Sequence, residues 1–215
     1  MRIKQRVIFW GGTGQSVVLN EAISYGDFKL ICIVDNREIE NFNDEDVVLL
    51  KGFEGLTSWL GKQESIDQIH CAVAIGGDKG RERLSLLKKM KSVGLSPLTI
   101  IHPAAFVSKK VSIGEGCQIL ANSTICVNVK IGAGTIINTA ASIDHDCVLG
   151  EGVHVGPGAH LAGEITVGDG TFIATGATVL PGLKIGADAI IGAGAVVISD
   201  VIDGAKMIGN PAKLI

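Results

Sequence analysis

A six-residue period dominates the second half of the chain. An aliphatic residue stands at every sixth position from Ile101 to Val197 without a miss, and a small or apolar residue follows four positions after it. A period of six matches neither the 3.6 residues of a helical turn nor the alternation of a simple strand. It is typical of a solenoid in which each hexapeptide forms one short strand and one turn, and three hexapeptides complete a triangular coil. We expect the repeat to end near 198–203 and to be followed by a tail.

The two halves of the chain differ in composition, which predicts two domains. Seven of the nine aromatic residues lie before residue 101. A narrow solenoid with aliphatic interiors and tight corners has no room for large rings, so their scarcity after that point agrees with the repeat. Two prolines, Pro97 and Pro103, bracket the change. We therefore predict a first domain over 1–98 and a second domain over 99–215.

Charge and cysteine content exclude several classes of protein. The formal net charge is −3, whereas a broad nucleic-acid surface needs a basic excess. No apolar run approaches the length of a membrane-spanning helix. The five cysteines form no Cys-x-x-Cys pair, which favours free thiols in a reducing cytoplasm over a disulfide framework or a metal site. The expectation is a cytoplasmic protein that binds neither membrane nor nucleic acid.

In the first half, short apolar runs alternate with helical patterns. This order is typical of an α/β domain with a parallel sheet. The expected strands cover 6–10, 29–34, 47–50 and 68–75, and the expected helices cover 15–25 and 79–93.

A glycine-rich turn, Gly11-Gly12-Thr13-Gly14, joins the first strand to the first helix. Such a turn directs backbone N–H groups and a helix N-terminus at an anion, usually phosphate. Asp35 ends the second strand, where it could contact a ribose or base. These features predict a Rossmann-like domain for a nucleotide, and an ordinary tight turn is the alternative. Val17 replaces the third glycine of the full dinucleotide fingerprint, which disfavours an NAD enzyme.

The stretch from Asn138 to Cys147 carries candidate chemistry. It places His145 between Asp144 and Asp146, and a flanking carboxylate can orient an imidazole and stabilise its cation. Such a histidine is a candidate general base. Gly163 lies one full coil after His145, on the same corner, where its backbone N–H could donate to a developing oxyanion. Turn geometry is the alternative reason for this glycine.

The whole chain resembles the NeuD/PglD-type bacterial sugar acyltransferases, hexapeptide-repeat proteins with a left-handed parallel β-helix. The most specific motif is the stretch 138–147, which matches the family's Asn-Thr-x-x-x-(Val/Ile)-(Glu/Asp)-His-(Glu/Asp)-Cys. The other motifs are the turn 11–14, Asp35-Asn36, Ile75-Gly76, Ile101-His102-Pro103 and the closing Gly209-Asn-Pro-Ala-Lys213.

The resemblance implies roles for individual residues. His145 would be the general base with Asp146 beside it, and Asn138 would contact the sugar or orient the base. Acetyl-CoA would be bound by His154, Gly163 and Lys213. The substrate would be held by Gly12, Thr13, Gly14, Asp35, Asn36 and Gly76 in addition to Asn138. His160 has no counterpart in the family and is expected to pack at a surface or interface.

The implied activity is acetyl-CoA-dependent N-acetylation of the 4-amino group of a nucleotide-linked amino-sugar, with UDP as the expected nucleotide. The product would enter bacterial surface glycans such as lipopolysaccharide. The enzyme would be a homotrimer with its sites between subunits, and it would need no metal. Sialic-acid-type O-acetylation and N-acetylation of a GDP-linked sugar are the close alternatives. A zinc carbonic anhydrase, with its ligands drawn from His145, His154 and His160, is a remote one.

Overall fold

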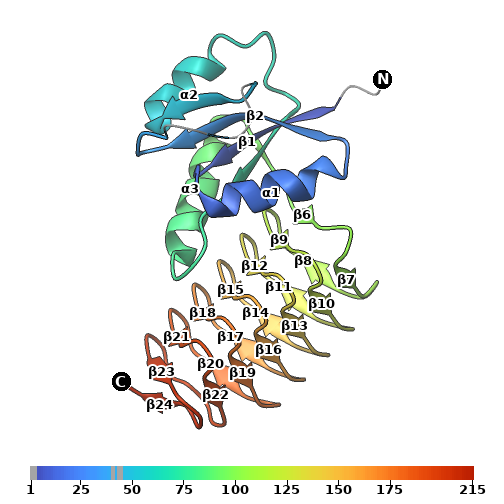
Figure 1. Cartoon of the computed structure of the whole chain (residues 1–215), viewed down its shortest axis with the longest axis vertical. Coiled ribbons are helices and arrows are strands. Elements are labelled where there is room, and N and C mark those ends of the chain that lie inside the picture. The colour runs from blue at the N-terminus through green and yellow to red at the C-terminus, as the bar shows by residue number, and fades with distance from the viewer. Residues whose placement is uncertain (1–3, 40–41, 43–45) are drawn as a thin grey trace. The chain divides into compact units, whose positions relative to one another are not determined.

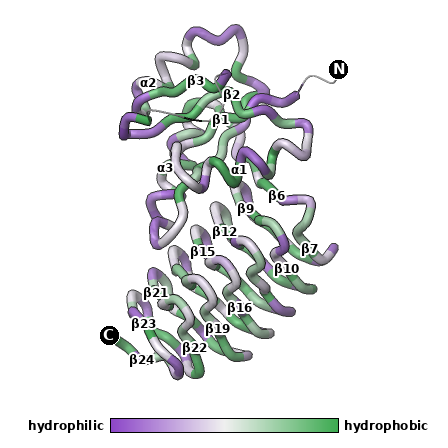
Figure 2. The backbone as a smooth tube through the Cα atoms, in the orientation of Figure 1, coloured by the Kyte–Doolittle hydropathy of each residue, from purple (hydrophilic) through white to green (hydrophobic). Residues whose placement is uncertain are grey.

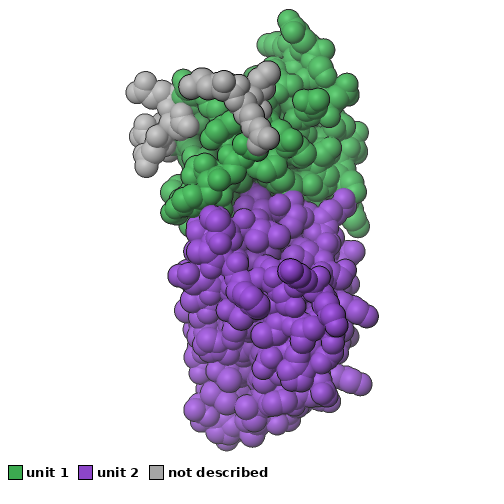
Figure 3. Space-filling model, turned by 90° about the vertical axis from the view of Figure 1, so that its right-hand side faces the viewer, with its two compact units in different colours: residues 1–75, 85–98 green, residues 76–84, 99–215 purple. Residues whose placement is uncertain are grey.

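The computed structural model describes residues 4–39, 42 and 46–215. The chain divides into two compact units (Figure 3). Unit 1 comprises residues 1–75 and 85–98, and unit 2 comprises residues 76–84 and 99–215. The assignment of 1–98 and 99–215 as separate domains stays a prediction.

Unit 1 contains a five-stranded sheet in the order β3-β2-β1-β4-β5, in which every pairing is parallel. Helices alternate with these strands along the chain, as the sequence predicts for a parallel sheet. The strands are β1 (Gln5–Trp10), β2 (Phe28–Asp35), β3 (Val48–Lys51), β4 (Ile69–Val73) and β5 (Ser96–Pro97). The helices are α1 (Gly14–Ser24), α2 (Gly52–Leu60) and α3 (Gly80–Ser92), of which α3 begins in unit 2 and ends in unit 1.

The carboxyl-terminal parts of the central strands β1 and β2 are buried, which agrees with the apolar residues found there. Residues Val7 to Trp10 of β1 are at most 4% exposed. Cys32 of β2 and Cys71 of β4 are fully buried and form no disulfide with a described residue, and burial raises the pKa of Cys32 to about 12. These cysteines pack as small apolar side chains.

Unit 2 contains a parallel β-helix of two-residue strands, drawn as a stack of coils in Figure 1. The predicted aliphatic residue is the second residue of every strand from β6 to β22. These strands are β6 (Ile100–Ile101), β7 (Phe106–Val107), β8 (Ser112–Ile113), β9 (Gln118–Ile119), β10 (Thr124–Ile125), β11 (Lys130–Ile131), β12 (Ile136–Ile137), β13 (Ser142–Ile143), β14 (Val148–Leu149), β15 (His154–Val155), β16 (His160–Leu161), β17 (Thr166–Val167), β18 (Phe172–Ile173), β19 (Thr178–Val179), β20 (Lys184–Ile185), β21 (Ile190–Ile191) and β22 (Val196–Val197).

Each strand pairs with the strand three places along, so the coil has three parallel faces. Their orders are β22-β19-β16-β13-β10-β7, β20-β17-β14-β11-β8 and β24-β23-β21-β18-β15-β12-β9-β6. Apolar segments recur along every coil in Figure 2. The interior aliphatics form one core with the small corner residues, among them Cys117 and Cys147, both fully buried. The period of six is the interval between successive inward side chains.

The coil continues beyond the end expected at 198–203. Val201, Ala205 and Met207 belong to the same buried core. The strand β23 (Lys206–Ile208) pairs parallel with β21, and β24 (Lys213–Leu214) then pairs antiparallel with β23. The coil therefore extends past the expected end at 198–203, because an irregular segment shifts the period while leaving apolar side chains to fill the next layer.

Candidate active site

His145 lies on the turn between β13 and β14, with its side chain 47% exposed. The backbone at the next residue, Asp146, is left-handed with φ of 58°. Asn128 and Glu164, one coil before and one coil after, have φ of 65° and 63°. This corner turns sharply at each coil through a left-handed residue and points its side chains outward.

Only one of the two flanking aspartates touches the His145 ring. The Nδ1–H of His145 donates to Asp146 Oδ2 at 2.8 Å. Asp144 instead accepts a hydrogen bond from the backbone N–H of His145 at 2.7 Å through its Oδ1. The two aspartates therefore have different roles. Asp144 binds the backbone of the turn, and Asp146 fixes the tautomer and orientation of the imidazole.

This environment prepares His145 to take up a proton at Nε2. The hydrogen bond to Asp146 raises the pKa of His145, with smaller contributions in the same direction from the charges of Asp144, Asp146 and Glu164. Because Asp146 occupies Nδ1, the neutral ring carries its lone pair on Nε2. A histidine with one nitrogen held by a carboxylate and the other open is the arrangement expected of a general base.

Gly163 is packed against this ring. A Cβ atom at Gly163 would lie 2.6 Å from His145 Nε2 and 2.7 Å from its Cε1. Gly163 is absent from the residues with positive φ, so turn geometry is not the reason for glycine here. None of the described residues accepts a hydrogen bond from the Gly163 N–H. The glycine therefore makes room for the imidazole and leaves a backbone donor open beside it.

Asn138 and His154 form a separate hydrogen-bonded pair. Asn138 Nδ2 donates to His154 Nε2 at 3.1 Å, and Asn138 Oδ1 accepts from the Thr139 N–H at 2.8 Å. His154 Nδ1–H donates to the carbonyl oxygen of Gly77 at 3.2 Å. Its ring lies against Phe172, with centroids 5.1 Å apart. No hydrogen bond joins Asn138 to His145 within the described residues.

The resemblance implies that His154 binds acetyl-CoA, which would need an accessible ring. His154 does point out of the coil, but it is only 5% exposed because the segment 76–84 of unit 2 covers it. Arg83 of that segment is 1% exposed and donates to the carbonyl oxygens of Gly134, Gly152 and Val153. Burial and the charge of Arg83 lower the pKa of His154 to about 4, so the ring is neutral near pH 7.

This buried histidine predicts a specific acid sensitivity. The ordinary pKa of histidine is about 6.5. Between pH 6.5 and pH 4, His154 is therefore protonated in the unfolded chain but neutral in the folded chain. As the pH decreases through this window, the free energy of unfolding should decrease by about 1.4 kcal/mol per pH unit because of this residue. Denaturant titrations of His154→Gln should show a shallower dependence of the free energy of unfolding on pH than the wild-type protein shows. Equal slopes for His154→Gln and wild type would contradict the assignment.

The glycine-rich turn of unit 1 uses Asp35 internally. Asp35 is 6% exposed, and its Oδ2 accepts from the Gly12 N–H at 3.1 Å. Its Oδ1 accepts from the backbone N–H of Arg37 at 2.9 Å, and the Arg37 guanidinium donates to both oxygens. These bonds outweigh burial and hold the pKa of Asp35 below its ordinary value. Asp35 therefore shapes the turn and carries a paired charge.

The other predicted substrate residues lie at the ends of the strands of unit 1 or just after them. Thr13 and Gly14 are exposed at the N-terminus of α1, and no acidic residue lies in its first turn. Asn36 is exposed directly after β2, and Gly76 follows β4. In unit 2, the predicted CoA contact Lys213 is exposed on β24.

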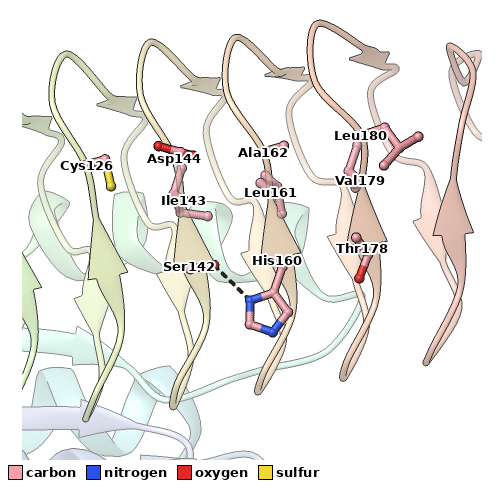
Figure 4. Close-up of a pocket in the computed structure, with 10 residues that line it drawn as sticks. All are labelled: Cys126, Ser142, Ile143, Asp144, His160, Leu161, Ala162, Thr178, Val179 and Leu180. Carbon is pink, nitrogen blue, oxygen red and sulfur yellow. Dashed lines mark hydrogen bonds between the residues drawn. The ribbon is translucent and has the colours of Figure 1, made fainter.

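A hollow of about 310 Å³ lies on the face of β10, β13, β16 and β19. Figure 4 shows Ser142, His160 and Thr178 at equivalent positions on neighbouring strands of this face. A hydrogen bond of 2.8 Å joins Ser142 Oγ to His160 Nδ1. Asp144, the neighbour of His145, is also part of the lining, so the hollow adjoins the turn that carries the candidate base.

Two structural partners escaped the sequence argument. Arg83 falls in a helical pattern, where an arginine normally indicates a solvated face, so no signal in the sequence marks it as buried. Asn128 donates from Nδ2 to Asp146 Oδ1 at 2.9 Å. Its separation of 18 residues from Asp146, one full coil, is a signal that could have found it.

No helix of the described residues has the length and apolar character needed to cross a bilayer. Within the same residues, no three histidine, cysteine or acidic side chains gather as a metal-binding group.

Comparisons with known proteins agree with this architecture. The family model "Bacterial transferase hexapeptide (six repeats)" matches residues 164–199. No curated protein matches the chain in a sequence search.

Solved structures match over nearly the full length. A histidine-to-asparagine form of perosamine N-acetyltransferase from Caulobacter crescentus, in complex with CoA and GDP-perosamine, is 37% identical, with a TM-score of 0.88 over 97% of this chain and 96% of that one. The acetyltransferase domain of PglB from Neisseria gonorrhoeae FA1090, in complex with acetyl coenzyme A, is 31% identical, with a TM-score of 0.88 over 99% and 100% of the two chains. WeeI from Acinetobacter baumannii AYE shares the fold at 24% identity, with a TM-score of 0.74 over 97% and 99%.

The repeat, the parallel coil and these full-length matches agree with one another, and they show that the chain is an acyltransferase belonging to the hexapeptide-repeat, left-handed β-helix family of bacterial sugar acetyltransferases of the NeuD/PglD type.

Proposed function

We propose that this enzyme transfers the acetyl group of acetyl-CoA to the 4-amino group of a nucleotide-linked amino-sugar, with His145 as the general base. The observation that carries the proposal is the arrangement at one corner of the coil. His145 is bound through Nδ1 to Asp146, its Nε2 is open, and the unpaired N–H of Gly163 lies in the residue packed against the ring.

The proposed chemistry needs one proton transfer in each direction. The neutral amine attacks the carbonyl carbon of the thioester. The carbonyl oxygen of the thioester becomes an oxyanion, which accepts a hydrogen bond from the Gly163 N–H. His145 Nε2 takes the proton released by the amine nitrogen, and Asp146 stabilises the resulting imidazolium. The intermediate then collapses with cleavage of the carbon–sulfur bond, and the imidazolium returns its proton to the CoA thiolate.

We place the acetyl-CoA arm in the hollow beside this corner. The hollow is lined in part by His160, Leu161 and Ala162, and it adjoins the turn that carries His145. The structure of PglB from N. gonorrhoeae, with the same fold, holds acetyl coenzyme A. Lys213 remains a proposed phosphate contact. Because the ring of His154 is buried, we propose that His154 orients the side-chain amide of Asn138 and does not contact acetyl-CoA directly.

For unit 1 we propose a Rossmann-like nucleotide site. The support is its parallel sheet with the order 3-2-1-4-5 and the exposed turn at the N-terminus of α1, because such a turn suits a phosphate. The residues of unit 1 proposed to surround the nucleotide-sugar are Gly12, Thr13, Gly14, Asp35 and Asn36, and the role of Gly76, the first residue of unit 2, stays a prediction from the sequence. The resemblance of the sequence favours UDP, whereas the relative that is 37% identical was crystallised with GDP-perosamine. Both nucleotides are therefore candidates.

The remaining proposals concern assembly and location. We propose a homotrimer, in which a site at an outward corner such as that of His145 would be completed by the neighbouring subunit. We also propose that the enzyme works in the cytoplasm, where acetyl-CoA and nucleotide-sugars are available, and that its product enters surface glycans.

Ligand-dependent melting and product analysis test this function. The matching nucleotide should stabilise the protein by about 2.7 kcal/mol at about 100 times its Kd, so a thermal-shift screen of UDP, GDP and CMP should show one clear response. The corresponding 4-amino-sugar should then release CoA thiol from acetyl-CoA and gain one acetyl group. A product that resists mild alkali is an amide and supports N-acetylation. An alkali-labile ester would indicate O-acetylation, and no turnover with any of these sugars would contradict the proposal.

A further inference from the structure

Asn128 occupies the turn directly stacked on Asp146. It lies between β10 and β11, and Asp146 lies between β13 and β14. Because β10 pairs with β13 and β11 pairs with β14, the two turns are adjacent rungs of one corner. The Asp146 N–H also donates to the carbonyl oxygen of Val127 at 3.1 Å, so the same neighbouring turn holds both its backbone and its side chain.

Asn128 completes a chain of hydrogen bonds that ends at the His145 ring. Asn128 Nδ2 donates to Asp146 Oδ1 at 2.9 Å, and Asp146 Oδ2 accepts from His145 Nδ1–H at 2.8 Å. Each carboxylate oxygen thus has one protein partner. Asp146 is about half exposed, so without Asn128 its carboxylate could turn about the Cα–Cβ and Cβ–Cγ bonds and exchange the imidazole for water.

We propose that Asn128 is a positioning residue for acyl transfer, which keeps the Asp146 carboxylate aimed at His145 and thereby keeps the Nε2 lone pair directed toward the Gly163 side of the corner. The inference rests on the proposed role of His145 as base. Asn128 itself touches neither the imidazole nor, in this proposal, a substrate. Asn128 restricts the side chain of Asp146, and this restriction favours the His145 tautomer that carries its proton on Nδ1.

The left-handed backbone at Asn128 allows a clean substitution. Its φ is 65°, a region that glycine adopts without steric cost. Asn128→Gly therefore removes the amide without straining the turn. Asn122 is a matched control, because it also has φ of 57° but lies on a different corner of the coil. The charged and titratable groups that bear on the His145 ring are Asp144, Asp146 and Glu164, and both variants leave all three in place.

The test follows acetyl transfer and the ionisation of His145 in parallel. With Asn128→Gly, we expect kcat to fall about tenfold with an unchanged KM, and we expect the acid limb of the kcat profile to move to lower pH. Histidine ¹⁵N NMR should show a lower pKa for His145 and a loss of the Nδ1–H tautomer, with the His145 signals identified by their absence in His145→Asn. Asn122→Gly should retain the wild-type values.

The NMR result separates this inference from the proposed function. If the wild-type enzyme acetylates no amino-sugar, the His145 titration and tautomer still report whether Asn128 orients the pair. A wild-type pKa and tautomer in Asn128→Gly would overturn the inference even in an active enzyme. An equal loss of kcat in Asn128→Gly and Asn122→Gly would also overturn the inference. The loss would then come from the greater flexibility that glycine gives to any turn of the coil.

Discussion

Replacing His145 by asparagine should lower acetyl transfer by at least two orders of magnitude while the protein remains folded. A general base contributes about 10²–10⁴-fold, and asparagine can occupy the same exposed turn without accepting a proton at the working pH. Among the described residues the side chain makes one hydrogen bond, to Asp146, and it is 47% exposed. Steady-state rates of CoA thiol release measure the loss.

Folding controls decide how that result is interpreted. The His145→Asn protein should keep the wild-type melting temperature to within a few degrees, because the substitution removes no buried group. Its KM for acetyl-CoA should also remain close to wild type. Turnover within a few-fold of wild type would overturn the assignment of His145 as base. A large drop in melting temperature would instead indicate a structural role.

Gly163→Ala should produce the second large loss. The new methyl group would lie 2.6 Å from His145 Nε2, closer than non-bonded atoms approach, so the imidazole must move. A displacement of about 1 Å at a reacting group can cost about 100-fold in rate. The backbone at Gly163 is outside the left-handed region, so alanine adds no strain of its own. Rates measured at saturating substrate should fall by about this factor.

A double variant separates the steric effect from any other consequence of alanine at this position. In His145→Ala the ring is absent, so adding Gly163→Ala should cost neither further melting temperature nor further residual activity. Non-additivity of this kind is the sign of direct contact between two sites. If Gly163→Ala costs the same in both backgrounds, the glycine acts independently of the histidine, and the steric explanation is wrong.

The repeat was predictable because it is local and iterated. Each inward aliphatic from Ile101 to Val197 meets the same environment in every coil, so a single period in the sequence determines the three faces of the coil. Stacking by one coil likewise places His145 beside Gly163 from sequence spacing alone, and the structure brings the two residues into contact. The prediction failed near residue 198, where the period is lost and only packing against the preceding layer shows that the coil continues through Met207.

Within the corner that carries His145, the sequence singled out the residues but did not show what each of the two aspartates binds. Asp144 and Asp146 flank His145 symmetrically in the sequence, whereas the left-handed backbone at Asp146 turns only that carboxylate toward the ring. Asn128 was hidden for a similar reason, since asparagine at a turn is ordinarily explained by the turn itself.

The sequence by itself thus determined the coil, the parallel α/β unit and the corner that carries His145, because all three depend on short, repeated patterns. Only the tertiary structure decided that His154 is a buried, neutral partner of Asn138. That outcome depends on the carbonyl oxygen of Gly77, which is 77 residues away in the chain, and on the buried Arg83. A single long-range contact of this kind repeats nowhere in the sequence, so it leaves no period to detect.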